Sequence, residues 1–596
     1  MRRHSNIPQY PDIPSVFVRK KGIFSSAGAV GVVITSKFAW LMYCNHNPNI
    51  SLDSADYVRY HARMIPKVRS FILSGIDASI CEIETDLDDT QLQKETVVGL
   101  PDAAVRESLE RVRSAMGNSG YPMPRGRTLI NLAPAAVRKE GPAYDLPIAV
   151  GVLIAQGVIQ ERRPVGIGAG NGYGSKFGSE FGAGESPEEL FGLDPRSVLI
   201  AGELALDGRV RPIRGVIAMV SLAKSLGLDA VIVPDANASE AAVVNGVRVF
   251  GVSSLAQVVG LFNGGLALEP TPPLDVGAML QKSTASVDFG EIKGQESVKR
   301  ALVIAAAGQH NIVMIGPAGT GKTMMAKALP GILPPLSPEE AVEVTRVYSS
   351  TGLLDSEAGL ITSRPVRTPH HTASSPAIVG GGIVPRAGEI SLAHHGVLFL
   401  DELPEFSRVV LETMRQPLED RIVTIARAHG TVKFPASFML VAAMNPTPRG
   451  DVMPGEAGQR EMDRYLSKIS GPLMDRIDLH VEAPAVPWSE LSKKATGSTT
   501  EMMRKLVLDA RALMHDRQGT LVNAQLRGKQ LDETMQLSEP GRILLEQAMT
   551  QLGLSARGYD KVRRVSRTIA DISGSIDVKP EHIGEAVQYR LLDRRV

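Results

Sequence analysis

A glycine-rich run that ends in a lysine and a threonine has the residue types needed to bind phosphate. It reads GPAGTGKT at residues 316–323 and fits the spacing GxxxxGK[ST], with an apolar run before it at 311–315 and helix formers after it up to Pro330. In such a strand–loop–helix, backbone N–H groups face phosphate oxygens and the helix N-terminus adds positive charge. A glycine turn without a ligand would have the same local pattern, but the motifs that follow disfavour it. We expect ATP to be bound by Gly316, Pro317, Ala318, Gly319, Thr320, Gly321, Lys322 and Thr323, with Lys322 on the β- and γ-phosphates and Thr323 on Mg²⁺.

Two further apolar runs end in polar side chains suited to nucleotide hydrolysis. GVLFLDE, at 396–402, ends in Asp401 and Glu402, and FMLVAAMN, at 438–445, ends in Asn445. We expect Asp401 to bind Mg²⁺, Glu402 to act as the base that polarises water, and Asn445 to orient that water or touch the γ-phosphate. Alternatively, Asp401 and Glu402 are solvated surface acids after a buried strand, without a catalytic role. The glycine loop upstream makes this alternative less favoured.

Length and composition limit the molecule that carries these motifs. A chain of 596 residues is too long for one core, so several domains are expected. Its net charge of +1 gives no global basic field, so any contact with nucleic acid must be local. Cys44 and Cys81 are the two cysteines, too few for a disulfide framework or a cysteine zinc site, which suits a reducing cytoplasm.

The residues before the glycine loop alternate between strand and helix patterns. Strands are predicted at 79–86, 128–132, 198–206 and 230–233, and helices at 102–116, 146–156 and 217–226, which indicates an α/β or α+β domain. The glycine-rich stretch 166–186 is interpreted as an insertion. Residues 1–63 are predicted to be a disordered extension or the product of an upstream start.

Three stretches in this region resemble a known family. VGLPDAAVRES (98–108), NLAPAAVRKEGPAYDLPIA (131–149) and GELALDGRVRPIRGV (202–216) are similar to the N-terminal domain of the ComM family, magnesium-chelatase-like AAA+ ATPases. The resemblance implies an α/β fold: a P-loop AAA+ parallel-sheet domain with a C-terminal helical lid, preceded by an α+β domain like that of Lon proteases (ribosomal S5 domain 2-like). The implied boundaries are 64–263 for the Lon-like domain, 264–287 for a linker, 288–495 for the ATPase domain and 496–596 for the lid.

The resemblance also assigns arginines to the site. Arg476, in SGPLMDRIDL, resembles the arginine finger, which acts on the ATP of a neighbouring subunit, so a ring of identical copies, a hexamer, is implied. Its plain alternative is an ion pair with Asp475 or Asp478. Arg557 resembles sensor 2, which reaches the γ-phosphate from the lid, with Arg564 in reserve. Arg563 and Arg567 are interpreted as solvated or interface charges.

Lon-type proteases use a serine and a lysine, and this chain lacks both at the matching positions. The serine position is Ala143 and the lysine position is Met219. A Ser–Lys dyad needs a hydroxyl nucleophile and an amine base. The domain is therefore predicted to be catalytically inactive and to serve for contacts.

A predicted β-hairpin at 420–434 and the stretch 364–382 are the places where a substrate would bind. The resemblance puts such insertions at the central pore, where Arg427, His429 and Lys433 would meet DNA phosphates. Solvation of the hairpin by the same charges has nearly equal weight. The histidine doublets at 370–371 and 394–395 are not interpreted as metal ligands, because no carboxylate cluster has ligand spacing around them.

These patterns together predict a cytoplasmic AAA+ ATPase that uses ATP and Mg²⁺. Its implied use is a DNA motor or helicase for branch migration in recombination or natural transformation. A magnesium-chelatase-type motor for porphyrin metallation, an ATP-dependent Lon-like protease and a non-enzymatic scaffold are the alternatives. The long N-terminal domain argues against the chelatase, Ala143 and Met219 argue against the protease, and the hydrolysis motifs argue against the scaffold.

Overall fold

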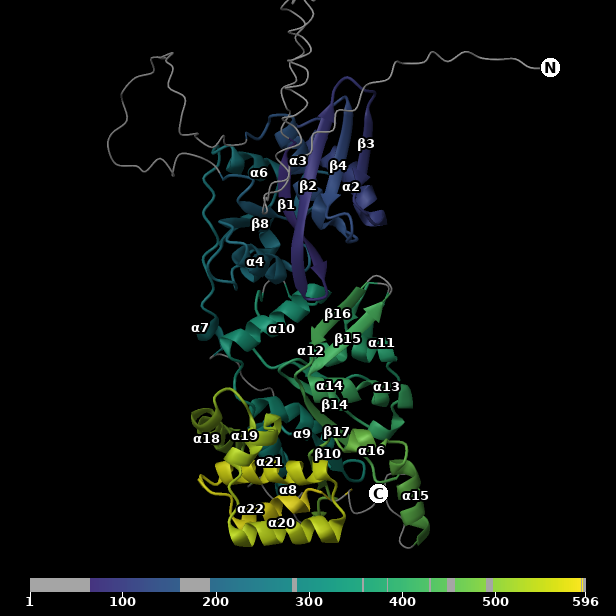
Figure 1. Ribbon diagram of the computed structural model, residues 1–596, viewed down its shortest axis with the longest axis vertical. Helices are drawn as coiled ribbons and strands as arrows, with labels where there is room; N and C mark the ends of the chain where they lie inside the picture. Colours follow the sequence, from purple (N-terminus) through teal and green to yellow (C-terminus); the bar gives the residue numbers. More distant parts are fainter. Residues whose placement is uncertain are drawn as a thin grey trace, which may run out of the picture. The chain divides into compact units, whose positions relative to one another are not determined.

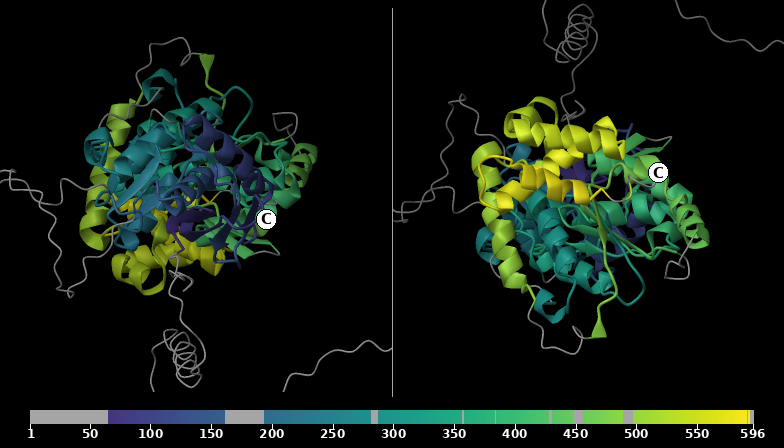
Figure 2. Two further views of the ribbon diagram at one scale, coloured as in Figure 1. Left: turned by 90° about the horizontal axis from the view of Figure 1, so that it is seen from above. Right: turned by 90° about the horizontal axis from the view of Figure 1, so that it is seen from below.

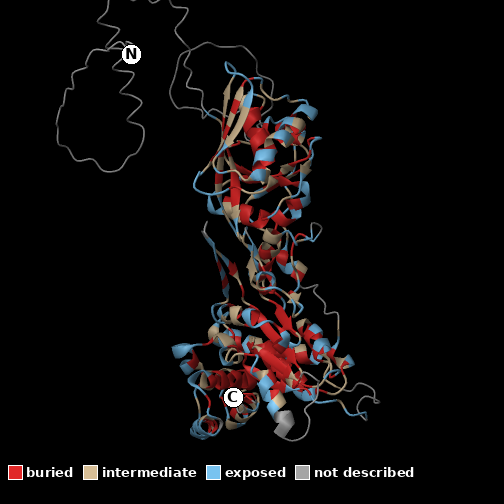
Figure 3. Cartoon of the chain, turned by 90° about the vertical axis from the view of Figure 1, so that its right-hand side faces the viewer, coloured by how far each residue is buried: buried red, intermediate tan, exposed pale blue. Residues whose placement is uncertain are grey.

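Five short strands from the second half of the chain form one parallel sheet, in the order β11-β14-β17-β10-β18 (Figure 1). Every residue of β14 and β17 is buried, and Figure 3 shows the same concentration of buried residues in this sheet. Continuous apolar runs of this kind are expected where helices cover both faces of a parallel sheet. The strands are β10 (Ile312–Ile315), β11 (Val366–Arg367), β14 (Val397–Leu400), β17 (Met439–Met444) and β18 (Leu479–Glu482).

The computed structural model describes residues 65–160, 193–280, 287–355, 358–382, 384–427, 430–447, 456–488, 497–590 and 592. The extension expected at 1–63 and the glycine-rich stretch 166–186 lie outside these residues. Ile65–Val596 form one compact unit. No helix in the described ranges has the length and apolarity needed to cross a membrane.

Helices enclose the parallel sheet and continue into a helical C-terminal segment. α21 packs against α8, α18 and α22, and α20 packs against α22, as the views of Figures 1 and 2 show. The expected helical character of the C-terminal segment is confirmed for residues 497–590, where strand-like pairing is limited to one isolated bridge, Leu537–Val578. The main helices are α8 (Glu296–Gly308), α9 (Lys322–Ala328), α10 (Pro338–Thr351), α18 (Thr500–Gln518), α19 (Gly528–Thr534), α20 (Glu539–Leu552), α21 (Ala556–Ile572) and α22 (Pro580–Gln588).

Two arginines of α21 are placed differently from the sequence-based interpretation. Arg567 is 2% exposed and donates to Asp571, and Arg563 is 8% exposed and pairs with Asp532. The interpretation as solvated charges was wrong, because α21 lies among other helices and has no fully solvated face. A buried guanidinium needs such a carboxylate partner.

Short elements lie between β10 and β18 in the part of the chain that contains the parallel sheet. The hairpin predicted at 420–434 is confirmed as β15 (Ile422–Arg427) and β16 (Gly430–Pro435), and a smaller hairpin consists of β12 (Gly380–Gly381) and β13 (Arg386–Ala387). The remaining helices here are α11 (Ser375–Val379), α12 (Glu389–Leu392), α13 (Arg408–Thr413), α14 (Arg415–Asp420), α15 (Glu456–Leu466) and α16 (Gly471–Met474).

Residues 67–262 form a second, mixed sheet in the order β3-β4-β2-β1-β5-β8-β9. The strand expected at 198–206 is shorter than predicted, because β5 ends at Ile200 and the chain turns near Gly202, whose N–H donates to the carbonyl of Ala143. The strands of this sheet are β1 (Lys67–Ser74), β2 (Asp77–Asp88), β3 (Lys94–Val98), β4 (Arg127–Ala133), β5 (Val198–Ile200), β8 (Ala230–Pro234) and β9 (Arg248–Val252). A separate antiparallel pair consists of β6 (Glu203–Leu204) and β7 (Val210–Arg211). The helices are α2 (Ala103–Asn118), α3 (Asp145–Ala155), α4 (Val216–Ser225), α5 (Ala238–Ala241), α6 (Leu255–Phe262) and, within the expected linker, α7 (Val276–Leu280).

The mixed α/β character of the chain is confirmed, and the closer likeness to Lon proteases stays a prediction. Met219 is fully buried on α4 in an apolar cluster, and Ala143 lies in the turn before α3. Neither position carries a nucleophile or an amine, so the geometry gives the protease alternative no support.

His480 ties the stability of the parallel sheet to pH. Its side chain is fully buried on β18, and its backbone N–H donates to the carbonyl of Tyr589 after α22. Burial, together with the charges of Arg590 and Lys561, holds the pKa of His480 well below its usual value. The unfolded chain therefore binds a proton below pH 6.5 that the folded chain does not, and folding stability falls as the pH drops below 6.5.

We predict that His480→Gln weakens this pH dependence. Between pH 6.5 and 5.5 the wild-type free energy of unfolding should fall by up to about 1.4 kcal/mol more than that of the variant, the limit for one group over one pH unit. Urea denaturation followed by circular dichroism measures both proteins. His515→Gln, at an exposed position on α18, is the control and should follow the wild type. Parallel curves for His480→Gln and wild type would contradict the assignment.

Candidate nucleotide-binding site

The residues predicted to bind and hydrolyse a nucleotide follow three neighbouring strands. The glycine loop follows β10, Asp401 follows β14, and Asn445 follows β17. β17 lies between the other two strands, paired in parallel with both, so the ends of the three strands meet at one edge of the sheet. Crevices at such an edge, where the strand order reverses, are where ligands bind in open α/β sheets.

The glycine loop has backbone conformations and close contacts that a residue with a side chain would not fit. Gly319 and Gly321 have φ values of 81° and 83°, in the left-handed region that favours glycine. A Cβ added at Gly316 would lie 2.0 Å from the carbonyl oxygen of Ala483, after β18. The loop therefore follows the sheet edge closely and leads directly into α9, which begins at Lys322.

Lys322 is a buried cation that only neutral oxygens surround at hydrogen-bond distance. It is 8% exposed, and its Nζ donates to the carbonyls of Gly316 and Pro317, each at 2.7 Å. The Oδ1 of Asn445 lies 3.3 Å from the same Nζ. Burial lowers the pKa of Lys322, although the charge of Asp401 opposes this shift. An anion such as a phosphate would relieve the cost of burying this charge.

Thr323 and Asp401 come together beside the lysine. The Thr323 hydroxyl donates to Oδ2 of Asp401 at 2.8 Å, and the Glu402 N–H donates to Oδ1 at 3.0 Å. A hydroxyl and a carboxylate are hard oxygen ligands of the kind that Mg²⁺ takes next to phosphates, so these residues fit the expected ion. Glu402 is exposed and has a φ of 54°, an uncommon value for a residue other than glycine.

Arg476 and Arg557 lie at the opposite end of the parallel strands from the glycine loop. The carbonyl of Arg476 accepts from the side chain of Asn311, directly before β10, and its guanidinium bonds to Glu419 and to the Pro472 carbonyl. β10 has four residues and spans about 13 Å, so these contacts hold Arg476 at the opposite end of the strand from the glycine loop. The sequence-based alternative, an ion pair with Asp475 or Asp478, is replaced by the pair with Glu419.

A cavity of about 350 Å³ at this second edge gathers more positive charge than the sequence predicted. The sequence does not reveal this cluster, because its charged residues are far apart in the chain. They come from the region of α14, from the residues before β18 and from the C-terminal segment. Burial lowers the pKa of Arg421 to about 10. The cationic side chains that line the cavity are Arg421, Arg476, Arg527, Arg557, Lys561 and Arg564, and the acidic ones are Glu419, Asp475, Asp478 and Asp560.

One hairpin, β15–β16, carries the residues predicted to contact DNA, and the hairpin β12–β13 adjoins it. Arg427 and Lys433 on β15 and β16 are exposed, and so is Arg386 on β13. A Cβ added at Gly381 on β12 would lie 3.5 Å from the guanidinium of Arg427, so the hairpins adjoin each other. His429 lies outside the described residues.

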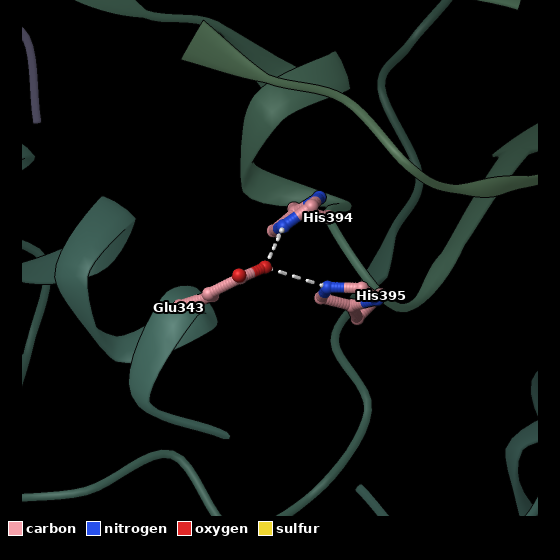
Figure 4. Close-up of side chains that lie close together, drawn as sticks. All are labelled: Glu343, His394 and His395. Carbon is pink, nitrogen blue, oxygen red and sulfur yellow. Dashed lines mark hydrogen bonds and ion pairs between the residues drawn. The ribbon is translucent and has the colours of Figure 1, made fainter. Parts of the chain in front are cut away.

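His394 and His395 meet Glu343 of α10 in a cluster that resembles a metal site (Figure 4). The Ser437 N–H donates to Nδ1 of His394 at 3.0 Å, so the proton of this neutral ring is on Nε2, which donates to Glu343 at 3.2 Å. Nε2 of His395 also faces Glu343, at 2.9 Å, and these two contacts hold the pKa of Glu343 well below its usual range. Because the His394 lone pair that a metal needs is already used, the cluster is better explained as a connection between α10 and β14.

Comparison with known proteins identifies the family. Three models match: "Magnesium chelatase, subunit ChlI" at residues 288–491, its C-terminal counterpart at 497–590, and "Subunit ChlI of Mg-chelatase" at 83–168 and 188–237. The chain is 39% identical to competence protein ComM of Haemophilus influenzae over 526 residues, which cover 87% of this chain and 96% of that protein.

Other relatives match over a similar length. Protein YifB of Salmonella typhimurium, an uncharacterized protein, is 39% identical over 87% of this chain and 96% of its own length. An uncharacterized protein of Mycobacterium bovis is 37% identical over 87% of this chain and 97% of its own length. With its glycine loop, parallel sheet and helical C-terminal segment, the chain belongs to the ComM family of magnesium-chelatase-like proteins.

Proposed function

We propose that this protein is a Mg²⁺-dependent AAA+ ATPase that works as a ring and couples ATP hydrolysis to movement along DNA. The observation that carries the proposal is the meeting of Lys322, Thr323, Asp401 and Asn445 at one edge of the parallel sheet. Lys322 would bind the β- and γ-phosphates, and Asn445 would orient the attacking water. Thr323 and Asp401 would hold Mg²⁺, which, when bound, supplies charge neutralisation for the phosphates.

Glu402 would complete the chemistry as the general base. Its exposed carboxylate follows directly on Asp401, so it lies next to the proposed metal ligand. Water attack on the γ-phosphorus forms a new P–O bond while the bond to the bridging oxygen of ADP breaks, and the water proton passes to the carboxylate. The residues proposed to bind ATP and the proposed base thus all lie at the carboxyl ends of the parallel strands.

The proposal of a ring is supported by the absence of an arginine among the described residues placed at the glycine loop. Arg476 and Arg557 are held at the far end of β10, too distant to touch a nucleotide on their own glycine loop. In a ring, the cationic cavity of one copy would face the nucleotide of the next, and Arg476 would stabilise the transferred phosphoryl group. Arg557 and Arg564 would act on the same phosphates in trans.

Movement along DNA is supported by the exposed cations on the two adjoining hairpins and by the printed name of a relative, a competence protein. The test is the ATPase rate without DNA and with single-stranded, duplex or four-way-junction DNA, at two salt concentrations. Stimulation that fades with salt supports the proposal. A rate indifferent to every DNA would remove the motor from it and favour a chelatase-type role.

We predict that Lys322→Ala abolishes ATP turnover and weakens nucleotide binding, because the variant loses the cation that faces the phosphates. Lys327→Ala removes a lysine from the exposed side of the same helix and is the matched control. A fluorescent ATP analogue measures binding, and phosphate release measures turnover. Equal turnover in Lys322→Ala and wild type would rule out this site.

We predict that Arg476→Ala lowers kcat by about 10³-fold or more, the effect of losing a trans arginine, with little change in ATP affinity. Arg542→Ala, at an exposed arginine of α20, is the control. Mixing Arg476→Ala with Lys322→Ala should restore part of the rate, because some interfaces then pair an intact loop with an intact arginine. No recovery in the mixture would show that Arg476 does not act between copies.

We predict that the double variant Arg427→Ala/Lys433→Ala binds DNA more weakly and with a salt dependence smaller by about two contacts, since each phosphate contact contributes about 0.9 to the slope. Fluorescence anisotropy at several salt concentrations measures this slope. Lys529→Ala, at a lysine that is 90% exposed in the C-terminal segment, is the control. An unchanged slope in the double variant would place the DNA elsewhere.

A further inference from the structure

Arg421 differs from the other cations of the cavity at the far end of β10, because its side chain has no partner. No hydrogen bond or ion pair joins its guanidinium to any described residue. Burial and the neighbouring charge of Arg527 lower the pKa of Arg421, and Asp478 opposes this shift only in part. Each of the other cations has an oxygen partner: Arg476 pairs with Glu419, Arg527 with the carbonyl of Glu419, Arg557 with Asp475, Lys561 with the carbonyl of Ile477, and Arg564 with the carbonyl of Ala524.

The cavity has the charge to attract a phosphate group. Six cationic and four acidic side chains line its volume of about 350 Å³, which leaves an excess of positive charge. An unpartnered guanidinium among other cations is unfavourable until an anion is bound. The planar fork of an arginine matches two oxygens of a phosphate. Arg421 is therefore the group of this cavity that is most available to a phosphate.

The backbone at Arg421 favours residue types other than arginine. Its φ of 58° and ψ of 25° lie in the left-handed region, directly after α14. Glycine and asparagine adopt this conformation more readily. The N–H of Arg421 donates to the carbonyl of Pro417 at 2.9 Å, which ties the residue to the helix. An arginine in this position indicates a use for its side chain.

Arg421 also closes the base of the hairpin that is proposed to contact DNA. β15 begins at the next residue, and the carbonyl of Arg421 accepts from the N–H of Ala436, directly after β16. The two strands are paired along their whole length, so a shift of the base is carried to the exposed Arg427 and Lys433. Coupling between two sites requires an element that both can bias. The hairpin, with Arg421 at its base, is such an element between the cavity and the DNA-facing cations.

We propose that Arg421 is a positioning residue that binds the phosphates of the nucleotide held by the neighbouring copy and thereby sets the position of the β15–β16 hairpin. The guanidinium would pair with the phosphate, and the base of the hairpin would follow it. ATP in one copy would then strengthen the binding of DNA by the next copy around the ring. This inference rests on the proposed function, which supplies the ring, the ATP and the DNA. It adds the residue through which nucleotide and DNA influence each other.

The test is the affinity for fluorescein-labelled single-stranded DNA, measured by anisotropy without nucleotide and with saturating AMP-PNP, a non-hydrolysable ATP analogue. In the wild type the analogue should tighten DNA binding by about fivefold or more, the lower end of typical coupling between two sites. Arg421→Asn removes the charge and suits the left-handed backbone, so its DNA affinity should not respond to the analogue. Its affinity without nucleotide should match the wild type, because Arg427 and Lys433 remain.

Two further variants separate the phosphate contact from general damage. Arg421→Lys keeps a cation but loses the planar fork, and should retain part of the response. Arg415→Asn removes an arginine of α14 that pairs with Glu412 and does not line the cavity, and should respond like the wild type. Thermal midpoints show whether each variant is folded. Loss of the response in Arg415→Asn as well would show a general effect of α14 and would overturn the inference.

A mixture of variants shows whether the contact crosses between copies. Coupling is reciprocal, so DNA should tighten the binding of a fluorescent ATP analogue by the wild type by the same factor. Arg421→Asn alone should show no such gain, and Lys322→Ala alone should bind little analogue. In the mixture, some loops of Arg421→Asn copies face the intact Arg421 of Lys322→Ala copies, and the gain should reappear. A mixture without the gain would mean that Arg421 does not act on a neighbour.

The remaining outcomes separate this inference from the proposed function. A response to the analogue that persists in Arg421→Asn would overturn the inference and leave the motor intact, and a wild type without the response would do the same. A response that is lost in Arg421→Asn, in a protein whose ATPase rate ignores DNA, would support the link at Arg421 and overturn the motor. A wild type that binds no DNA would overturn both.

Discussion

The reversal of strand order at β10 is the constraint on which the rest of the site depends. From β10 the chain runs to the far strand β11, returns through β14 and β17, and then crosses to β18 on the other side. The glycine loop begins at the carboxyl end of β10, and ligands of open α/β sheets bind at such a reversal point. There Lys322 is buried among neutral oxygens, a costly arrangement for a cation that phosphate would relieve.

The same sheet separates the proposed nucleotide site from the arginines that we propose complete catalysis. One edge carries the loop, Asp401 and Asn445, whereas the other carries Arg476 and the cationic cavity. Because β10 is a short rigid spacer, one copy cannot bring the two together. Under the proposed function, assembly would then be a way to control hydrolysis.

Much of this site was predictable, because its chemistry is local in the chain. The glycine loop, the acids after β14 and the hairpin at 420–434 all have short-range signals, and the structure contains the strands and turns expected there. Helix α10 was not predicted, although Ser337 and Glu340 form a capping box at its start, with Pro338 in the first helical position. Arg563 and Arg567 were misjudged because the charged face of an amphipathic helix is expected to be solvated until the elements packed against it are known.

The sequence by itself determined the glycine loop and the type of each strand-end residue, since spacing and periodicity express backbone rules that act over a few residues. Its stretches at 98–108, 131–149 and 202–216 pointed to the family by resemblance. Only the tertiary structure decided which of these groups meet. It put Arg476 with Glu419 and away from the loop, joined His371 to Glu402, and paired Glu343 with His394 and His395. Such contacts join residues far apart in the chain, and strand order and helix packing, which no local pattern encodes, bring them within a few ångströms.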